Sequence, residues 1–396
     1  MRKDAIWLIS GGPMQALAAK EIKNQGYALI ISDKNPQAIC RELADCFVTI
    51  DTFDIEGHLL AADTLSSDFN IKAVLTVAAD CHLTVACTGQ HLGVHHLSPE
   101  ISRNCRNKLE TRKLLSQAGL TQPSFHAASS YDQALKILSQ HPNLPFVIKA
   151  TDNSGSRGFS TIPLGHTLSQ KQFESALESG TTGLVILEEA LQNSPDEISE
   201  ASVETLWIDG KMHWLNWVDR IFSRDLKFFP GVTLDGQVGA GVELGHINPA
   251  NHSPALQAQI KEQIEKAGQA LGMDQQSGGH VLKADIFFSI AGPIILELTP
   301  RLSGGWDSSG SSPARGANVV GGVIKLALGE AMTPTDWDRF FKFNDNTAVV
   351  MSEIQPGAED CIGRKFALAQ GPDDIAQLIN KAVNKLQEGE YLVPIL

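Results

Sequence analysis

Short apolar runs, separated by glycine or polar turns, are the main pattern of the first hundred residues. Runs of strand length that alternate with helical patterns are typical of a parallel sheet buried on both faces. We therefore predict a small parallel α/β domain over residues 1–106. The strand-like runs and the helix that follows the first of them are Ala5–Ser10, Met14–Gln25, Tyr27–Ser32 and Ala73–Val77.

From residue 107 onward the pattern changes to a helix followed by recurring strand-like segments with a further helix among them. We predict an α+β body over residues 107–330, divided near residue 186, and a small α+β subdomain over residues 331–396. Two strands on either side of the turn at Gly292 form a predicted hairpin. The predicted elements are Lys108–Ala118, Phe146–Lys149, Leu184–Leu187, Ser202–Trp207, Lys211–Val218, Ala255–Ala270, Lys283–Ser289, Ile294–Leu298, Thr347–Glu353 and Asp373–Glu388.

Composition narrows the class of protein. The chain has 396 residues, 42% of them hydrophobic, and a net charge of −13 that is spread along the sequence. An acidic balance argues against a general nucleic-acid binder, which needs clustered cations. No apolar run approaches the ~20 residues that span a bilayer, and the six cysteines form no CxxC pair. We expect a cytoplasmic enzyme that acts on small molecules, without membrane or nucleic-acid partners; homodimer formation is left open.

Two glycine-rich turns are candidates for a nucleotide site. The first, at Gly11-Gly12, follows a predicted strand, but Pro13 and Ala16 stand where a dinucleotide fingerprint needs glycine. We interpret it as a structural turn, with NAD binding as the alternative. The second follows Lys149, which ends a buried strand and leads into TDNSGSRGF. A lysine there needs an anion, and the following loop can fold over phosphates; a surface loop is the alternative.

The predicted hairpin carries a second group of chemical side chains. Asp285 lies on one strand and Glu297 on the other, and Thr299 shares a face with Glu297 because side chains alternate along a strand. Carboxylates on neighbouring strands suit Mg²⁺, which shares hard oxygen ligands with substrate phosphates. Arg301 follows closely and could neutralise charge on a transferring phosphoryl group.

Together these segments resemble the ATP-grasp superfamily over roughly residues 1–330. VIKATDNSGSRGF resembles its phosphate-covering loop, NKLETRKLLSQAGLTQP its lysine-bearing helix, EASVE its ribose-binding strand and ILELTPR its metal motif, with Thr299 in place of the usual asparagine. The resemblance implies an ATP-grasp fold after a parallel leader domain, and ATP with two Mg²⁺ ions, or Mn²⁺, as cofactors. The implied ATP-binding residues are Lys108, Lys149, Ser154, Gly155, Ser156, Arg157, Gly158, Glu188, Glu189, Leu191, Glu200 (or Glu197), Phe287 and Leu296; the metal ligands are Asp285, Glu297 and Thr299.

The type of ligase is indicated by two shorter segments. VELGHINP and RLSGG are similar to segments of amino-acid and dipeptide ligases, which join a carboxylate to an amine through an acyl phosphate. Arg301 and Lys149 are the predicted catalytic residues. A bicarbonate-dependent carboxylase and a catalytically silent nucleotide-binding module remain as alternatives. The candidate substrate residues are Arg220, Arg224, Glu243, His246, Ser303, Gly304, Trp306, Asp307 and Arg315.

Overall fold

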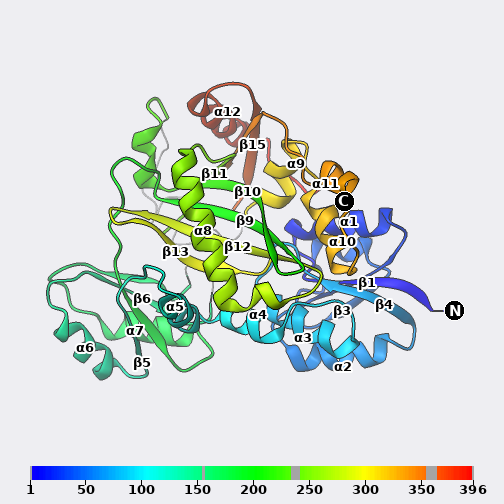
Figure 1. The fold of residues 1–396 in the computed structure, drawn as a ribbon, viewed down its shortest axis with the longest axis horizontal. Coiled ribbons are helices and arrows are strands. Elements are labelled where there is room, and N and C mark those ends of the chain that lie inside the picture. Colours follow the sequence, from blue (N-terminus) through cyan, green and yellow to red (C-terminus); the bar gives the residue numbers. More distant parts are fainter. Residues whose placement is uncertain (1, 154–156, 233–240, 354–363, 395–396) are drawn as a thin grey trace.

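The computed structural model describes residues 2–153, 157–232, 241–353 and 364–394. Within these ranges the strands form three sheets of four, seven and four strands. Figure 1 shows the seven-stranded sheet in the middle, with the leader sheet on one side and the other small sheet on the opposite side. No helix in the described ranges is long and apolar enough to cross a membrane.

The leader domain is the parallel sheet that the sequence predicted. Its strand order is β3-β2-β1-β4, and all neighbours run parallel. The strands are β1 (Lys3–Ile9), β2 (Ala28–Asp33), β3 (Cys46–Thr49) and β4 (Phe69–Leu75), and the helices are α1 (Ala16–Asn24), α2 (Ile55–Leu65), α3 (His82–Leu92) and α4 (Pro99–Arg106).

Helices on both faces of the leader sheet explain its continuous apolar strands. Ile6 and Leu8 of β1 pack toward α1 and toward α10 (Val319–Ala327), whereas Trp7 packs on the other face toward α2 and α3. Because α10 comes from far along the chain, it ties the leader domain to the rest of the protein. Because both faces of the strand are covered, apolar residues are favoured at every position along it.

A second four-stranded sheet, with order β5-β8-β6-β7, presents two chemically different faces. Phe146 and Ile148 of β6 pack into an apolar core with α6 and α7. The intervening Lys149 points to the opposite face, toward Glu188 of β8. The elements are α5 (Lys108–Gln117), β5 (Phe125–Ala128), α6 (Tyr131–Gln140), β6 (Phe146–Ala150), β7 (Ser160–Ile162), α7 (Gln170–Glu178) and β8 (Val185–Glu189).

The central sheet is antiparallel and has the order β13-β12-β9-β10-β11-β14-β15. The predicted hairpin is confirmed, and Asp285 lies directly opposite Glu297 in its register. The strands are β9 (Glu200–Ile208), β10 (Lys211–Ile221), β11 (Gly245–Asn248), β12 (Gly279–Ser289), β13 (Gly292–Thr299), β14 (Thr347–Ser352) and β15 (Phe366–Gly371). The last two strands carry this sheet across the boundary predicted near residue 330.

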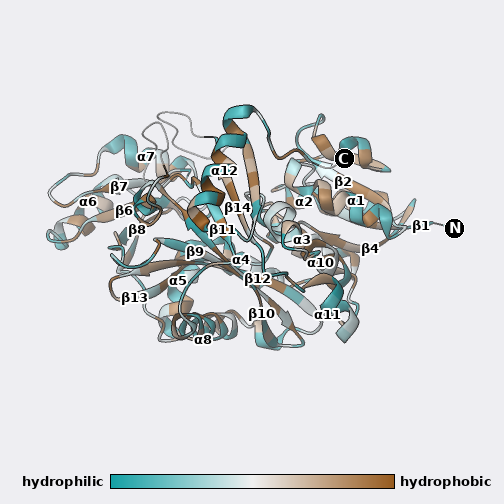
Figure 2. Ribbon diagram, turned by 90° about the horizontal axis from the view of Figure 1, so that it is seen from above, coloured by the Kyte–Doolittle hydropathy of each residue, from teal (hydrophilic) through white to brown (hydrophobic). Residues whose placement is uncertain are grey.

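One face of the central sheet is apolar and is covered by helices. Val203, Trp207 and Ala284 lie in one core with α8 (Pro254–Leu271) and α12 (Ile375–Glu388). In Figure 2, α12 shows apolar and polar sides, as expected of a helix that packs against a sheet. The opposite face is polar from Glu200 to Glu204, whereas Leu206 and Val281 on it join the apolar core with α10. The segment that holds α9 (Ser312–Ala314) packs over part of the polar area, and α11 (Pro334–Phe340) packs against α10.

Candidate functional site

The polar face of the central sheet gathers charged side chains from several strands. On β9 the alternate positions Glu200, Ser202 and Glu204 point to this face, because Val203 and Ala201 point into the apolar core. Their partners on β12 are Phe287, Asp285 and Lys283, in that order. The sheet register therefore places two carboxylates of β9 beside a lysine and an aspartate of β12.

Asp285 is held by two neighbours on this face. Lys283 Nζ donates to Asp285 Oδ2 at 2.6 Å, and the Ser202 hydroxyl donates to Oδ1. Burial opposes ionisation, but the charges of Lys283 and Arg220 outweigh it and hold the pKa of Asp285 below its ordinary value. Asp285 is thus an ionised carboxylate at neutral pH.

The donor set around the hairpin fits a hard divalent cation. Asp285 and Glu297 are opposite each other in the ladder, and Thr299 lies two positions beyond Glu297 on the same face. Their oxygens are the kind that Mg²⁺ prefers. The side chain of Glu297 is 30% exposed, and its nearest cation, Lys108 Nζ, lies 3.7 Å from Oε2. The carboxylate is therefore open to an incoming ligand.

A cavity of about 220 Å³ lies next to Glu297. Lys108 and Arg106 line it from the junction of α4 and α5, and Arg157 lines it from the loop after β6. Lys108 is placed by the N-cap of α5, where Asn107 accepts from the backbone N–H of Leu109, and its Nζ donates to Asn153 O at 2.6 Å. The three carboxylates Asp80, Asp152 and Glu297 also line the cavity, so it offers cations and hard-oxygen groups side by side.

Lys149, the lysine predicted to bind phosphate, belongs to a buried ion-pair network. Its Nζ donates to Glu188 Oε2 at 2.6 Å, and Arg112 Nε donates to Glu188 Oε1 at 2.8 Å. Arg112 also donates to the carbonyl of Ile295 at 2.7 Å, which links this sheet to β13. Burial disfavours the Glu188 charge, but Arg112 and Lys149 outweigh it and hold the pKa of Glu188 well below its ordinary value.

Arg301 connects the metal-motif strand with the leader domain. Its Nε donates to Asp80 Oδ1 at 3.0 Å, and its Nη1 donates to the carbonyl of Leu302 at 2.7 Å. Only 10% of the Arg301 side chain is exposed, while Asp80 lines the 220 Å³ cavity. A guanidinium fixed at two of its donors is preorganised to stabilise a developing negative charge.

A second polar cluster lies under the serine-rich segment after β13. Arg220 of β10 donates to Glu243 Oε1 at 3.0 Å, and its Nη2 lies 3.6 Å from Asp307 Oδ2. His246 on the neighbouring strand bonds the Ser311 hydroxyl at 3.1 Å. Burial and the charge of Arg220 lower the pKa of His246 well below its ordinary value, so its ring is neutral at pH 7.

No protein-family model matches the chain. Over 346 residues it is 23% identical to the uncharacterized protein y4rH of Sinorhizobium fredii, which covers 86% of this chain and 66% of that protein. The chain therefore spans just under two thirds of the length of this curated relative.

Several solved structures match nearly the whole chain. An L-amino acid ligase from Bacillus licheniformis has a TM-score of 0.70 and 18% identity over 99% of both chains. A phosphoribosylglycinamide synthetase from Anaerococcus prevotii has a TM-score of 0.67 and 15% identity over 99% of both chains. A carboxyaminoimidazole ribonucleotide synthase from Aspergillus clavatus has a TM-score of 0.68 and 13% identity, over 98% of this chain and 97% of that one.

The chain has the ATP-grasp fold. The resemblance inferred from the sequence is thereby confirmed at the level of the fold. Within this fold, the cavity beside Glu297 brings together Lys108 and Arg157 of the predicted nucleotide site with Asp80 of the leader domain. Ser154, Gly155 and Ser156 of the predicted phosphate loop lie outside the described residues.

Gly158 has a conformation and surroundings that suit only glycine. Its φ is +69°, and an added Cβ would lie 2.7 Å from Ser179 Cβ and 3.0 Å from Ala176 Cα. Gly165 has a similar φ of +78° but open space around it. The end of the predicted phosphate loop is therefore packed closely against α7.

Replacing Gly158 by alanine is expected to raise KM for ATP about 10-fold, because the added Cβ would collide with α7 and displace residue 158 from it. Gly165→Ala is the matched control, since it adds the same backbone strain without the contact, and it should leave KM for ATP within about twofold. Steady-state kinetics on both variants test this. Equal KM changes in the two variants would refute a special role for the Gly158 contact.

Glu204 and Asp307 form a pair of fully buried carboxyl groups in the ATP-grasp body. Glu204 Oε1 accepts from the backbone N–H of Ser303 at 2.7 Å, whereas Glu204 Oε2 and Asp307 Oδ2 have no hydrogen-bond partner among the described residues. Burial and the nearby Asp307 charge raise the pKa of Glu204 to about 7, and burial likewise raises the pKa of Asp307. The folded environment therefore favours the protonated form of Glu204.

This pair predicts that stability falls as pH rises. Glu204 has a higher pKa folded than its ordinary 4.5, so the folded state binds the extra proton and its advantage is lost between about pH 4.5 and 7. In Glu204→Gln that decline should be reduced, because an amide cannot ionise, and the variant should be more stable than the wild type at pH 8. Thermal unfolding at pH 5 and pH 8 measures both. A decline as steep in the variant as in the wild type would contradict the assignment.

The residues predicted to contact adenine and ribose are spread over several elements. Glu200 accepts from Arg224 Nη2 at 2.8 Å, beside Phe287, over which the Arg224 guanidinium lies 5.8 Å from the ring centre. The alternative ribose residue, Glu197, instead bonds His252 at 2.7 Å. Glu189 ends β8 next to Leu191, and Leu296 occupies an irregularity of the β12–β13 ladder. These nucleotide assignments stay predictions.

Three predicted substrate residues have mainly structural partners. Arg315 donates to Asn248 Oδ1 at 2.7 Å and to two backbone carbonyls of the segment before β14. Trp306 is buried with φ +66°, and Gly304 follows Ser303 at the start of the same loop, where a Cβ would approach Ala78. These residues shape the segment that covers Asp307.

The first glycine turn is closed by internal bonds. Asp33 at the end of β2 accepts from the backbone N–H of Gly11 at 2.8 Å and from that of Asn35 at 2.9 Å. In a dinucleotide-binding domain, the carboxylate at this position accepts from the ribose hydroxyls of the cofactor, so its oxygens would have to be available. The contacts favour the structural interpretation of this turn over NAD binding.

Several site residues were not singled out from the sequence. Arg112 interrupts the apolar stripe of α5 between Leu109 and Leu115, and a charge on such a stripe signals a buried partner. Glu204 lies four positions after Glu200 on the same strand, and because side chains alternate along a strand the two point to the same face. Asp80 and His82 reach the cavity from a leader-domain turn, for which the sequence carries no comparable signal.

Proposed function

We propose that this chain is an ATP- and Mg²⁺-dependent ligase that joins a carboxylate to an amine through an acyl phosphate. The observation that carries the proposal is the cavity in which Lys108 and Arg157 stand beside Glu297, with Asp285 directly across the ladder. A nucleoside triphosphate needs cations beside its phosphates, and its metal ion needs hard-oxygen ligands. The ATP-grasp fold supports the same function.

The nucleotide phosphates would contact Lys108, Lys149 and Arg157. Lys149 is held in place by Glu188, so its ammonium is positioned before the nucleotide arrives. Asp285 and Glu297, with the Thr299 hydroxyl, would hold Mg²⁺, which neutralises charge on the phosphate oxygens. The loop that ends at Gly158 would cover the phosphates and exclude water.

The reaction would run in two steps. A carboxylate oxygen attacks the γ-phosphorus of ATP, and ADP leaves. The amine nitrogen then attacks the acyl carbon, the carbon–oxygen bond to phosphate breaks, and phosphate departs. Arg301, fixed by Asp80, lies at the leader-domain side of the site and would stabilise the negative charge of this second step.

The carboxylate or the side chain of the acid substrate would contact the cluster formed by Arg220, Glu243, Asp307 and His246. Arg220 presents a buried guanidinium between Glu243 and Asp307, and neutral His246 lies on the next strand. Such a cluster offers both a cation and carboxylates, which suits an amphoteric substrate such as an amino acid. The pairing of acid and amine is therefore expected to include an amino acid.

ADP release from ATP and Mg²⁺, screened over paired amino acids, hydroxy acids and amines, tests the proposal. The expected result is ADP release that requires both an acid and an amine. Bicarbonate-dependent ADP release without an amine would instead identify a carboxylase. ATP binding without turnover under every pairing would identify a silent nucleotide-binding protein and refute the ligase proposal.

A further inference from the structure

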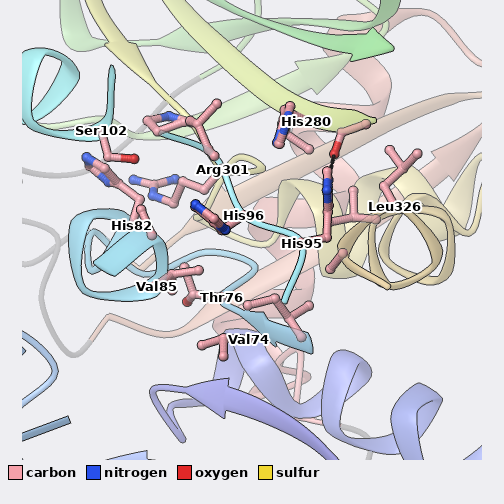
Figure 3. Close-up of a pocket in the computed structure, with 18 residues that line it drawn as sticks. Val74, Thr76, His82, Val85, His95, His96, Ser102, His280, Arg301 and Leu326 are labelled. Atoms are coloured by element: carbon pink, nitrogen blue, oxygen red, sulfur yellow. Dashed lines mark hydrogen bonds between the residues drawn. The ribbon is translucent and has the colours of Figure 1, made fainter. Parts of the chain in front are cut away.

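His82 lies between two cavities at the junction of the leader domain and the ATP-grasp body. It is the first residue of α3, its side chain is buried, and it lines both the 220 Å³ cavity and a neighbouring cavity of about 90 Å³. Figure 3 shows its ring on the same side of the smaller cavity as Ser102 and Arg301, whereas His95 and His280 lie at the far side. His82 thus borders the candidate active site.

Among the residues that the structure describes, neither ring nitrogen of His82 makes a well-formed hydrogen bond, although the backbone of Ser102 approaches the ring. The other histidines of the smaller cavity are anchored to backbone carbonyls. Burying an imidazole without its hydrogen bonds costs free energy. Such a histidine is therefore expected where a bound ligand supplies the missing hydrogen bonds. The anchoring pairs are His95 Nε2 with Gly279 O at 3.1 Å, His96 Nδ1 with Val94 O at 2.8 Å, and His280 Nε2 with Ser277 O at 3.1 Å.

Burial keeps the imidazole ring of His82 neutral. Burial lowers the pKa of His82 to about 4; Asp80 opposes this, and the cations Arg301 and Arg106 add to it. These three charged groups come from the turn before α3, the end of β13 and the end of α4. An anion brought into the cavity would raise the basicity of the ring again. His82 therefore offers a lone pair that becomes more basic once phosphate is bound.

The carboxylates that line the larger cavity already have partners. Asp80 is engaged by Arg301, Asp152 accepts from the backbone N–H of Thr181 at 2.9 Å, and Glu297 faces Lys108. Each of these carboxylates therefore already has a donor or a cation beside it. His82 has no such partner in the described structure.

We propose that His82 contacts the amine substrate and accepts its proton as the carbon–nitrogen bond forms. The inference rests on the proposed ligase function. The amine lone pair bonds to the acyl carbon, the carbon–oxygen bond to phosphate breaks, and phosphate leaves with that electron pair. The proton released from the amine nitrogen passes to the free imidazole nitrogen of His82. The ligand of this subsite is thus a neutral primary or secondary amine.

Hydroxylamine separates this role from a structural one. It is largely unprotonated at neutral pH and attacks an acyl phosphate without a base, so it reports on formation of the acyl phosphate alone. With the full chain and the acid found by ADP release, His82→Gln should form hydroxamate within about threefold of the wild type. Ligation of the amine should fall ~100-fold or more, and the deficit should shrink as pH rises and hydroxide takes the proton in place of the imidazole.

His96→Gln is the matched control, because His96 lines the smaller cavity but not the larger one. Both of its rates should stay near those of the wild type. Unchanged amine ligation in His82→Gln, or an equal loss of hydroxamate formation and ligation, would overturn the inference. If the wild type forms neither hydroxamate nor ADP with any acid, the ligase proposal fails and the inference fails with it.

Discussion

Replacing Glu188 by glutamine is expected to destabilise the protein by about 3–5 kcal/mol, because it leaves two cations buried without their counter-charge. Arg112 and Lys149 both contact this carboxylate, which is almost fully buried. Glutamine fits the space but cannot accept from both cations with a full negative charge. The shift of the urea-unfolding midpoint, relative to the wild type, measures the loss.

Acid should abolish the advantage of the wild type over Glu188→Gln. The folded-state pKa of Glu188 lies well below its ordinary 4.5, so its contribution is present above pH 4.5 and is lost as pH falls toward the lowered value. Glu110→Gln is the matched control, since Glu110 pairs with Lys113 on the exposed side of α5 and should cost less than ~1 kcal/mol. Equal losses in the two variants would contradict the buried network.

Replacing Glu297 by glutamine is expected to lower turnover ~10³-fold while ATP binding is retained. The amide keeps the shape of the side chain but removes the charge that would share Mg²⁺ with Asp285 across the ladder. The predicted adenine and ribose contacts lie on other residues, so nucleotide affinity should change far less than kcat. Kinetics of ADP release and titration with a fluorescent ATP analogue measure the two quantities.

Glu262→Gln provides the control for this variant. Glu262 lies on the solvent side of α8, where it pairs with Lys266, and its replacement should leave turnover unchanged. Full turnover in Glu297→Gln would remove Glu297 from the metal site. Loss of ATP binding equal to the loss of turnover would show that Glu297 serves binding rather than the chemical step.

The elements that the sequence predicted well are those with a clear period. The leader strands are apolar throughout because helices cover both faces, and β6 alternates between Phe146 or Ile148 in the core and Lys149 on the opposite face, beside Glu188. The hairpin followed from a turn between two alternating runs, and its register then placed Asp285 opposite Glu297. Local pattern and global fold agree at these positions.

The contacts that the sequence did not reveal join residues far apart in the chain. Asp80 and Arg301 are 221 positions apart, and Arg112 and Glu188 are 76 apart. Such pairs depend on how the leader domain and the two sheets pack together, which no local period encodes. The charge on the apolar stripe of α5 shows that a buried partner must exist for Arg112, but not which carboxylate it is.

Transfer of ¹⁸O tests the acyl-phosphate account most directly. The acid identified by ADP release is labelled with ¹⁸O in its carboxylate, and the phosphate formed with ATP and the amine is analysed by mass spectrometry. The carboxylate oxygen that attacks the γ-phosphorus stays on that phosphate, so each phosphate released should carry one ¹⁸O. Phosphate without ¹⁸O, or release of AMP and pyrophosphate, would contradict an acyl phosphate formed in the cavity beside Glu297.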